Sequence, residues 1–169
     1  MDCPDIFLHI SAILKIAGRS CRVRLGHLGR VRCEPGWRLG PDWAARLHDF
    51  DLWFVWAGRG TMKLKSGERL RLSPGTGVWM RAGGHYEAEQ DPAERLGVSY
   101  IHFDLLPPQR DLPLSGFVPP CEAFHTRQLG FVDATMRRVI ELGQERFARP
   151  VQAQAAQRSA TGLFASLLV

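Results

Sequence analysis

The sequence lacks several features that would place it in a specialised class. Its 169 residues include four cysteines, at positions 3, 21, 33 and 121. No two of them form a CxxC pair, which excludes a zinc ribbon and a thioredoxin-like redox site. No apolar run approaches the ~20 residues that a membrane-spanning helix needs. The sequence therefore predicts reduced thiols in a cytoplasmic protein that does not enter a membrane.

A secretory leader is also not indicated. Residues 6–17 are apolar enough to form the core of a signal peptide. However, the segment before them carries Asp2 and Asp5, has no Lys or Arg, and is followed by no clean small-x-small cleavage site. Residues 1–20 are instead predicted to be an N-terminal arm that packs on the domain.

The overall charge is compatible with an anionic partner but does not identify one. The formal net charge is +5, and the hydrophobic content of 45% is ordinary for a globular domain. Arginines are concentrated between residues 19 and 32, a pattern that is typical of a solvated strand face. No groove for nucleic acid is predicted within these residues.

Short strands separated by Gly and Pro dominate residues 20–106. Residues 52–57 form one continuous apolar run, and two alternating segments flank Ser66-Gly67, which predicts a hairpin. In this hairpin the side chains that share one face are Met62, Leu64, Leu70 and Leu72, and those on the other are Lys63, Lys65, Arg69 and Arg71. Regular short strands of this kind favour an antiparallel sandwich or barrel.

The remainder of the chain is predicted to be helical after a Pro-rich break. Residues 107–120 hold five prolines, and a helix should follow from residue 127. Apolar residues recur there at steps of three and four, and Pro150 separates this helix from a second, Ala-rich one. The apolar stripe could dock on the barrel or pair with its copy in a dimer. The chain stops on an apolar run, which predicts a cut within a helix and a further domain beyond residue 169.

An ordered set of short motifs resembles the N-terminal cupin-like effector domain of AraC-type transcription regulators. The matching residues are Arg46, Asp49–Val55, Gly58-Arg59-Gly60, Leu72–Gly75, His85-Tyr86 and Tyr100–Phe103. The resemblance implies a mainly β fold, a cupin-like double-stranded β-helix or jelly-roll barrel followed by two C-terminal α-helices. It also implies a domain that senses a small molecule and biases a helix-turn-helix domain on DNA, which would lie outside these residues.

The resemblance divides the chain into four parts and implies a homodimer. These parts are an arm at 1–20, a ligand-binding barrel at 21–106, a Pro-rich linker at 107–126 and a helical dimerisation segment at 127–169. The predicted interface residues are Leu129, Val132, Met136, Val139, Ile140 and Phe147.

Candidate ligand contacts combine aromatic faces with polar groups, as sugars and small organic acids require. The predicted ligand-binding residues are Arg46, His48, Trp53, Tyr86, Tyr100 and His102. Arg46 could take a carboxylate through both guanidinium nitrogens, and His102 shares a strand face with Tyr100. Trp53 lies on the face opposite Phe54 and Trp56, so only one of these two sets can line a cavity, and either could simply be core.

A metalloenzyme is the alternative. The cupin superfamily includes enzymes that hold a divalent metal with three or four His and carboxylate ligands. Only His48 and His85 stand at comparable positions here, and a rim or strand-end role for either is the simpler interpretation. The sequence therefore predicts a binding domain with no cofactor and no enzymatic activity. A metal-dependent cupin enzyme of dioxygenase or isomerase type and a stand-alone cupin binding protein remain as alternatives.

Overall fold

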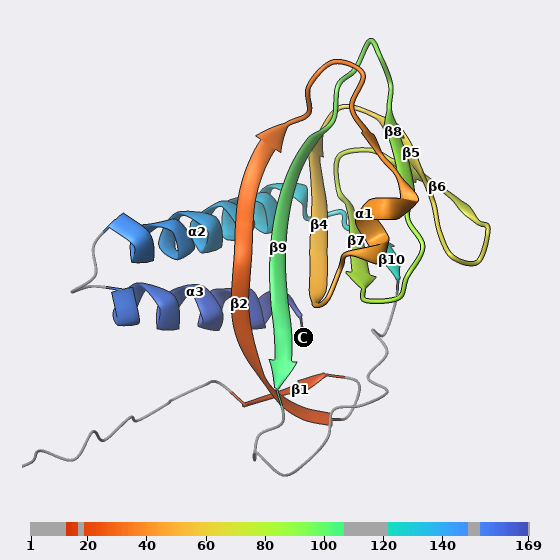
Figure 1. The fold of residues 1–169 in the computed structure, drawn as a ribbon. Coiled ribbons are helices and arrows are strands. Elements are labelled where there is room, and N and C mark those ends of the chain that lie inside the picture. Colours follow the sequence, from red (N-terminus) through yellow and green to blue (C-terminus); the bar gives the residue numbers. More distant parts are fainter. Residues whose placement is uncertain (1–12, 17–18, 107–121, 149–152, 169) are drawn as a thin grey trace, which may run out of the picture.

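The computed structural model describes residues 13–16, 19–106, 122–148 and 153–168 (Figure 1). It is mainly antiparallel β structure followed by two helices, as the sequence predicts. The elements are β1 (Ile13–Ile16), β2 (Arg19–Arg32), β3 (Arg38–Leu39), α1 (Pro41–Ala45), β4 (Phe50–Ala57), β5 (Gly60–Lys63), β6 (Arg69–Leu72), β7 (Thr76–Arg81), β8 (Glu87–Gln90), β9 (Gly97–Leu106), β10 (Ala123–His125), α2 (Leu129–Ala148) and α3 (Ala153–Leu167).

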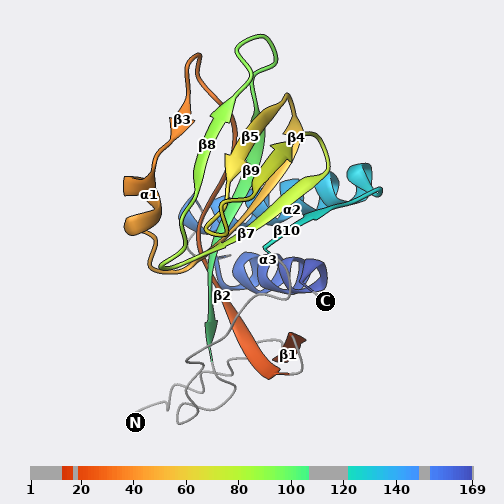
Figure 2. The ribbon, with the colours of Figure 1, turned by 90° about the vertical axis from the view of Figure 1, so that its right-hand side faces the viewer.

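The strands form two sheets. A larger sheet has the order β1-β2-β9-β4-β7-β10, and a smaller one has the order β3-β8-β5-β6. The helices α2 and α3 lie on the side of the larger sheet that faces away from the smaller one (Figures 1 and 2). The molecule is therefore layered as helices, large sheet and small sheet. None of the described helices is long and apolar enough to cross a membrane.

Two hydrophobic cores fill the spaces between these layers. The outer core, between the helices and the large sheet, includes Val23, Leu25, Leu52, Phe54, Ile101, Phe103, Met136, Val139 and Phe164. The inner core, between the two sheets, includes Trp53, Val55, Met62, Leu72, Val78, Met80 and Val98. Alternation along β4 and β9 assigns neighbouring residues to opposite cores, because successive side chains of a strand point to opposite faces.

The apolar run in β4 is explained by this arrangement. Leu52 and Phe54 enter the outer core, whereas Trp53 and Val55 enter the inner core. The prediction that Trp53 and Phe54 lie on opposite faces is confirmed. A strand in the middle of a sheet that is covered on both sides must be apolar on both faces.

The predicted hairpin is confirmed as β5 and β6. Met62 pairs with Leu70 and Lys63 with Arg69 across the two strands. Gly67 has a φ of 84°, a left-handed conformation that glycine adopts at little cost in the turn. Met62 is fully buried, and Lys63 and Arg69 are exposed on the outer surface of the small sheet.

The apolar stripe of α2 packs within the chain. Met136, Val139 and Ile140 are at most 5% exposed and belong to the outer core, with Val132 packed against it. These three side chains cover the outer face of the large sheet within this chain, and their place in a dimer interface stays a prediction. Leu129 remains 37% exposed.

The side chain of Phe147 lies outside the described residues. Residues 107–126 are predicted to be a Pro-rich linker, and most of this range lies outside the described residues. At its end Ala123–His125 form β10, which pairs with β7 through Phe124 and Gly77. A side chain at Gly77 would collide with the Phe124 ring, so the close approach needs glycine.

A polar contact fastens α2 to the sheet. The Arg30 guanidinium donates to Asp133 Oδ1 at 2.6 Å and to Ser99 Oγ at 2.8 Å. It also lies over the Trp56 ring, 4.1 Å from the ring centre. The side chains of Arg30 and Asp133 are 20% and 19% exposed. Such a part-buried, bidentate pair contributes more to the free energy of unfolding than an exposed ion pair does.

Replacing Asp133 with Ala should lower the free energy of unfolding by about 1–3 kcal/mol, because Arg30 then lacks its partner in a poorly solvated position. Glu141→Ala is the matched control, since Glu141 forms an exposed pair with Arg138 on the same helix. Its effect should stay below about 1 kcal/mol. Urea denaturation measures both values, and equal losses would contradict the anchoring role of Asp133.

Candidate active or binding site

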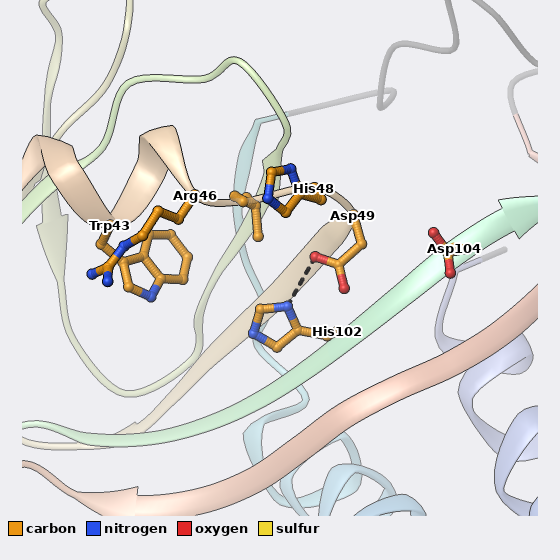
Figure 3. A pocket seen from close by; sticks show the side chains of 7 residues that line it. Trp43, Arg46, His48, Asp49, His102 and Asp104 are labelled. Carbon is orange, nitrogen blue, oxygen red and sulfur yellow. Dashed lines mark hydrogen bonds and ion pairs between the residues drawn. The ribbon is translucent and has the colours of Figure 1, made fainter.

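A cleft of about 570 Å³ opens beside α1, at one end of the space between the two sheets (Figure 3). It is lined by Trp43, Arg46, Leu47, His48, Asp49, His102 and Asp104. The first five come from α1 and the loop that follows it, and the last two from β9. Segments more than 50 residues apart in the sequence therefore build one site.

The helix α1 is short and its start is set by local chemistry. Pro41 occupies the first turn, where its missing N–H is not needed, and Gly40 precedes it in extended conformation. The helix buries Ala44 and places the Trp43 ring 6.1 Å from Trp53 and 6.5 Å from His102. Trp43 thus forms an aromatic wall of the cleft that continues into the inner core.

Two carboxylates hold the ring of His102 between them. His102 Nδ1 lies 3.0 Å from Asp49 Oδ1, the contact drawn in Figure 3. His102 Nε2 lies 3.5 Å from Asp51 Oδ2. The second contact follows from sheet register, because Asp51 on β4 pairs directly with His102 on β9. Asp49, His102 and Asp51, here called the Asp-His-Asp row, run from the cleft into the protein.

Asp51 is the most unusual member of this row. It is 0% exposed, and its Oδ2 accepts a hydrogen bond of 2.8 Å from Trp53 Nε1. Its Oδ1 has no hydrogen-bond partner among the described residues. Burial raises the pKa of Asp51 to about 7, although the nearby His102 and the Trp53 hydrogen bond act to lower it. A buried carboxyl with a free acceptor is suited to receive a donor.

Aromatic rings extend the site along the inner face of β9. Tyr100 lies 5.3 Å from the His27 ring and 6.0 Å from the His102 ring, measured between centres. Gly29 makes room for Tyr100, because a Cβ there would come within 2.6 Å of the phenol oxygen. Burial raises the pKa of Tyr100, so its hydroxyl keeps its proton and can donate.

The structure separates the predicted ligand-binding residues into three groups. Arg46, His48 and His102 line the cleft. Trp53 and Tyr100 belong to the inner core behind it. Their roles as ligand contacts remain predictions.

Tyr86 forms the third group. It is fully buried away from the cleft lining, and its hydroxyl accepts from the backbone N–H of Arg81. Its ring passes over Gly84, where a Cβ would come within 2.3 Å of it. Its predicted role as a ligand contact is also untested.

Sequence reasoning missed Trp43, Asp49, Asp51 and Asp104. Asp51 could have been found, because period-two alternation puts it on the same face of β4 as Trp53. Trp43 could not, since its position depends on how α1 folds over the end of the inner core.

The metal alternative finds no suitable ligand set. His48 lines the cleft, whereas His85 bonds to Glu87 at 2.5 Å, outside the cleft lining. No group of three or more His, Cys, Asp or Glu among the described residues is arranged to hold a metal ion. The donors present do not fit the three or four ligands that a divalent cation requires.

Comparison with known proteins gives likenesses in fold. No protein-family model and no curated protein matches the sequence. YhaK from Escherichia coli has a TM-score of 0.43 and 19% identity, over 67% of this chain and 46% of its own. KdgF from Halomonas sp. has a TM-score of 0.36 and 19% identity, over 54% of this chain and 81% of its own. A cupin protein from Bacteroides fragilis has a TM-score of 0.34 and 10% identity, over 60% of this chain and 78% of its own. The predicted mainly β fold with two C-terminal helices is confirmed by the strands and helices of the chain itself.

The prediction that this chain is not an enzyme is corrected. It was inferred from the small number of metal ligands. General acid-base catalysis needs no metal, and the described residues include a histidine between two carboxylates. A small number of metal ligands is therefore no ground for excluding catalysis.

Stability should depend on pH through Asp51. The folded state holds its proton up to pH of about 7, while the unfolded chain releases it near the ordinary value of 3.8. The free energy of unfolding therefore falls as the pH rises between these values. Asp51→Asn removes this loss, so the variant should gain about 2–3 kcal/mol relative to the wild type between pH 5 and pH 8.

Urea denaturation at the two pH values measures this difference. Glu68→Gln is the control, because Glu68 is an exposed carboxyl on the β5–β6 turn and its variant should follow the wild type at both pH values. A stability difference between Asp51→Asn and the wild type that does not change with pH would show that Asp51 is ionised throughout.

Proposed function

We propose that this chain is the effector-sensing domain of an AraC-type transcription regulator and that the cleft holds the effector. The motif resemblance and the cupin-like fold support this function. The observation that carries the proposal is the cleft itself, which is lined by the Trp43 ring and by the paired side chains of Asp49 and His102. Asp51 stands behind His102 and is coupled to the cleft through that ring.

The lining of the cleft favours a neutral polyhydroxy ligand over an organic acid. Asp49 offers acceptors, and a carboxylate ligand would be repelled by Asp49. The guanidinium of Arg46 lies on the Trp43 side of the cleft, away from Asp49 (Figure 3), and its Nε donates to the backbone oxygen of Asp42. Trp43 presents a flat ring to the C–H face of a sugar. A sugar-like effector therefore fits better than a small acid.

A route from the cleft to α2 is present in the contacts of β9. Tyr100 faces the inner core, and its neighbour Ser99 faces outward and accepts from Arg30. Arg30 in turn binds Asp133 on α2. A ligand that binds one arrangement of β9 better than another would shift the position of α2.

The partners of this domain follow as further parts of the proposal. The protein acts in the cytoplasm as a homodimer, and DNA is bound by a helix-turn-helix domain outside these 169 residues. Because the middle of the α2 stripe is buried, the dimer uses the exposed start of the helix. Leu129 is 37% exposed there and Phe131 63%.

Acid-base catalysis is the second candidate function. The Asp-His-Asp row combines a histidine, a half-buried carboxylate and a buried carboxyl whose pKa is near neutral, which is how general acids and bases are tuned. Such a row could move a proton on a bound sugar, as an isomerase does, without a metal. A cupin enzyme of isomerase type is therefore retained, whereas a metal-dependent one is not supported.

Different mutations should affect ligand binding and dimer formation. In a thermal-shift screen of monosaccharides, a sugar that binds the purified chain should raise its melting temperature. Trp43→Ala or Tyr100→Ala should weaken the binding of the best sugar at least about tenfold. Both variants should keep the dimer mass in solution. Phe131→Ala is the matched aromatic control, and it should bind the sugar normally while losing the dimer. Normal affinity in Trp43→Ala would remove the cleft from the effector site, and normal affinity in Tyr100→Ala would remove the part of the inner core behind it.

Catalysis can be tested with the same sugar. In D₂O, an isomerase would exchange the C–H next to the carbonyl for C–D, and NMR follows the loss of that proton signal. The sensor proposal predicts no exchange above the rate without protein. Exchange that disappears in His102→Gln but persists in His125→Gln, an exposed histidine of β10, would favour the enzyme instead.

A further inference from the structure

A second hollow is lined by residues of the small sheet and the turns at its end, and it shares no lining residue with the cleft. The small sheet is the layer farthest from α2 and α3 (Figure 2). The hollow measures about 640 Å³ and is bordered by four arginines, Arg38, Arg59, Arg69 and Arg71. They come from β3, the β4–β5 turn and β6. Nothing in the effector proposal uses this surface.

Strand register fixes how these arginines are spaced. Arg38 pairs with Glu89, Glu89 with Thr61, and Thr61 with Arg71, which makes one row across all four strands. Neighbouring strands are about 4.8 Å apart, so Arg38 and Arg71 flank the hollow at roughly 14 Å. Arg69 lies two residues from Arg71 on the same face, about 7 Å along the strand. The row therefore places Thr61 between Glu89 and Arg71 on the outer face of the small sheet.

Most of this positive charge is unpaired. No carboxylate lies within ion-pair distance of Arg38, Arg69 or Arg71 among the described residues, whereas Arg59 pairs with Glu94 at 3.3 Å. Two carboxylates also line the hollow, Glu89 and Asp91, and the Oδ1 of Asp91 accepts from the backbone N–H of Ala93. With Glu94 counted, four guanidinium groups against three carboxylates leave an excess of one positive charge at the hollow.

Charged residues on an edge strand can simply prevent pairing with another sheet, and β6 is an edge strand. That role needs charge on β6 alone. It does not need arginines from three segments placed around a hollow of ligand size. Guanidinium groups bind phosphate oxygens through paired hydrogen bonds, and several of them together favour a ligand with more than one phosphate.

We propose that this hollow binds phosphate groups of a polyanionic ligand through Arg38, Arg69 and Arg71. The phosphates belong either to a free polyphosphorylated small molecule or to a nucleic-acid backbone. Thr61 provides a hydroxyl donor at the centre of the row. The site is independent of the effector cleft, because the two share no lining residue.

Inorganic tripolyphosphate and a 20-base-pair DNA duplex are the two probes, titrated against the full chain by calorimetry at 50 mM salt. Wild type should bind at least one of them. Arg69→Gln with Arg71→Gln should weaken that binding at least about tenfold, since each charged hydrogen bond to phosphate is worth roughly this factor. Because both residues are exposed, the double variant should keep its fold, which circular dichroism verifies.

The control is Arg127→Gln with Arg158→Gln, which removes the same charge from exposed arginines that have no ion pair among the described residues. It should bind within about twofold of wild type. Binding of tripolyphosphate alone identifies a small-molecule site, and Arg69- and Arg71-dependent binding of DNA alone identifies backbone phosphates. The proposal is overturned if neither probe binds wild type, or if the control loses as much affinity as the Arg69/Arg71 variant.

Discussion

The architecture depends on one constraint, which is that β4 and β9 are covered on both faces. Each strand sends alternate apolar side chains into the outer and the inner core, as Phe54 and Val55 do on β4. The inner face needs the small sheet as its cover, and the outer face needs α2 and α3. Loss of either layer would expose a continuous apolar surface, which explains why the stripe of α2 is buried inside this chain.

The same constraint gives the cleft its chemistry. Asp51 takes an inward position on β4, and sheet register puts it opposite His102. A carboxyl in this position is almost fully removed from water, and burial therefore brings its pKa close to neutral. A folded protein retains such an unsatisfied group at a cost in stability, and retention is understandable where the group serves binding or proton transfer.

Much of the fold could be predicted from the sequence, because it follows from local periodicity. Alternation of period two gave the β5–β6 hairpin and the opposite faces of Trp53 and Phe54, and the motif order indicated a cupin-like barrel. The burial partner of α2 was not predictable from its stripe, since an apolar face does not state what covers it. The residues of the site could be predicted only in part, for the same reason. His102 could be identified from strand parity, whereas Trp43 depends on how α1 closes over the inner core.

The most direct test of this account is the carboxyl titration of Asp51, followed by ¹³C NMR in the free protein and with a bound monosaccharide. The account predicts a pKa near 7 in the free protein. It also predicts a shift of this pKa when a monosaccharide binds, because a ligand that bonds to Asp49 or His102 changes the charge that His102 presents to Asp51. A pKa close to the ordinary value of 3.8, or one that the bound sugar leaves unchanged, would contradict the coupling of Asp51 to the cleft through His102.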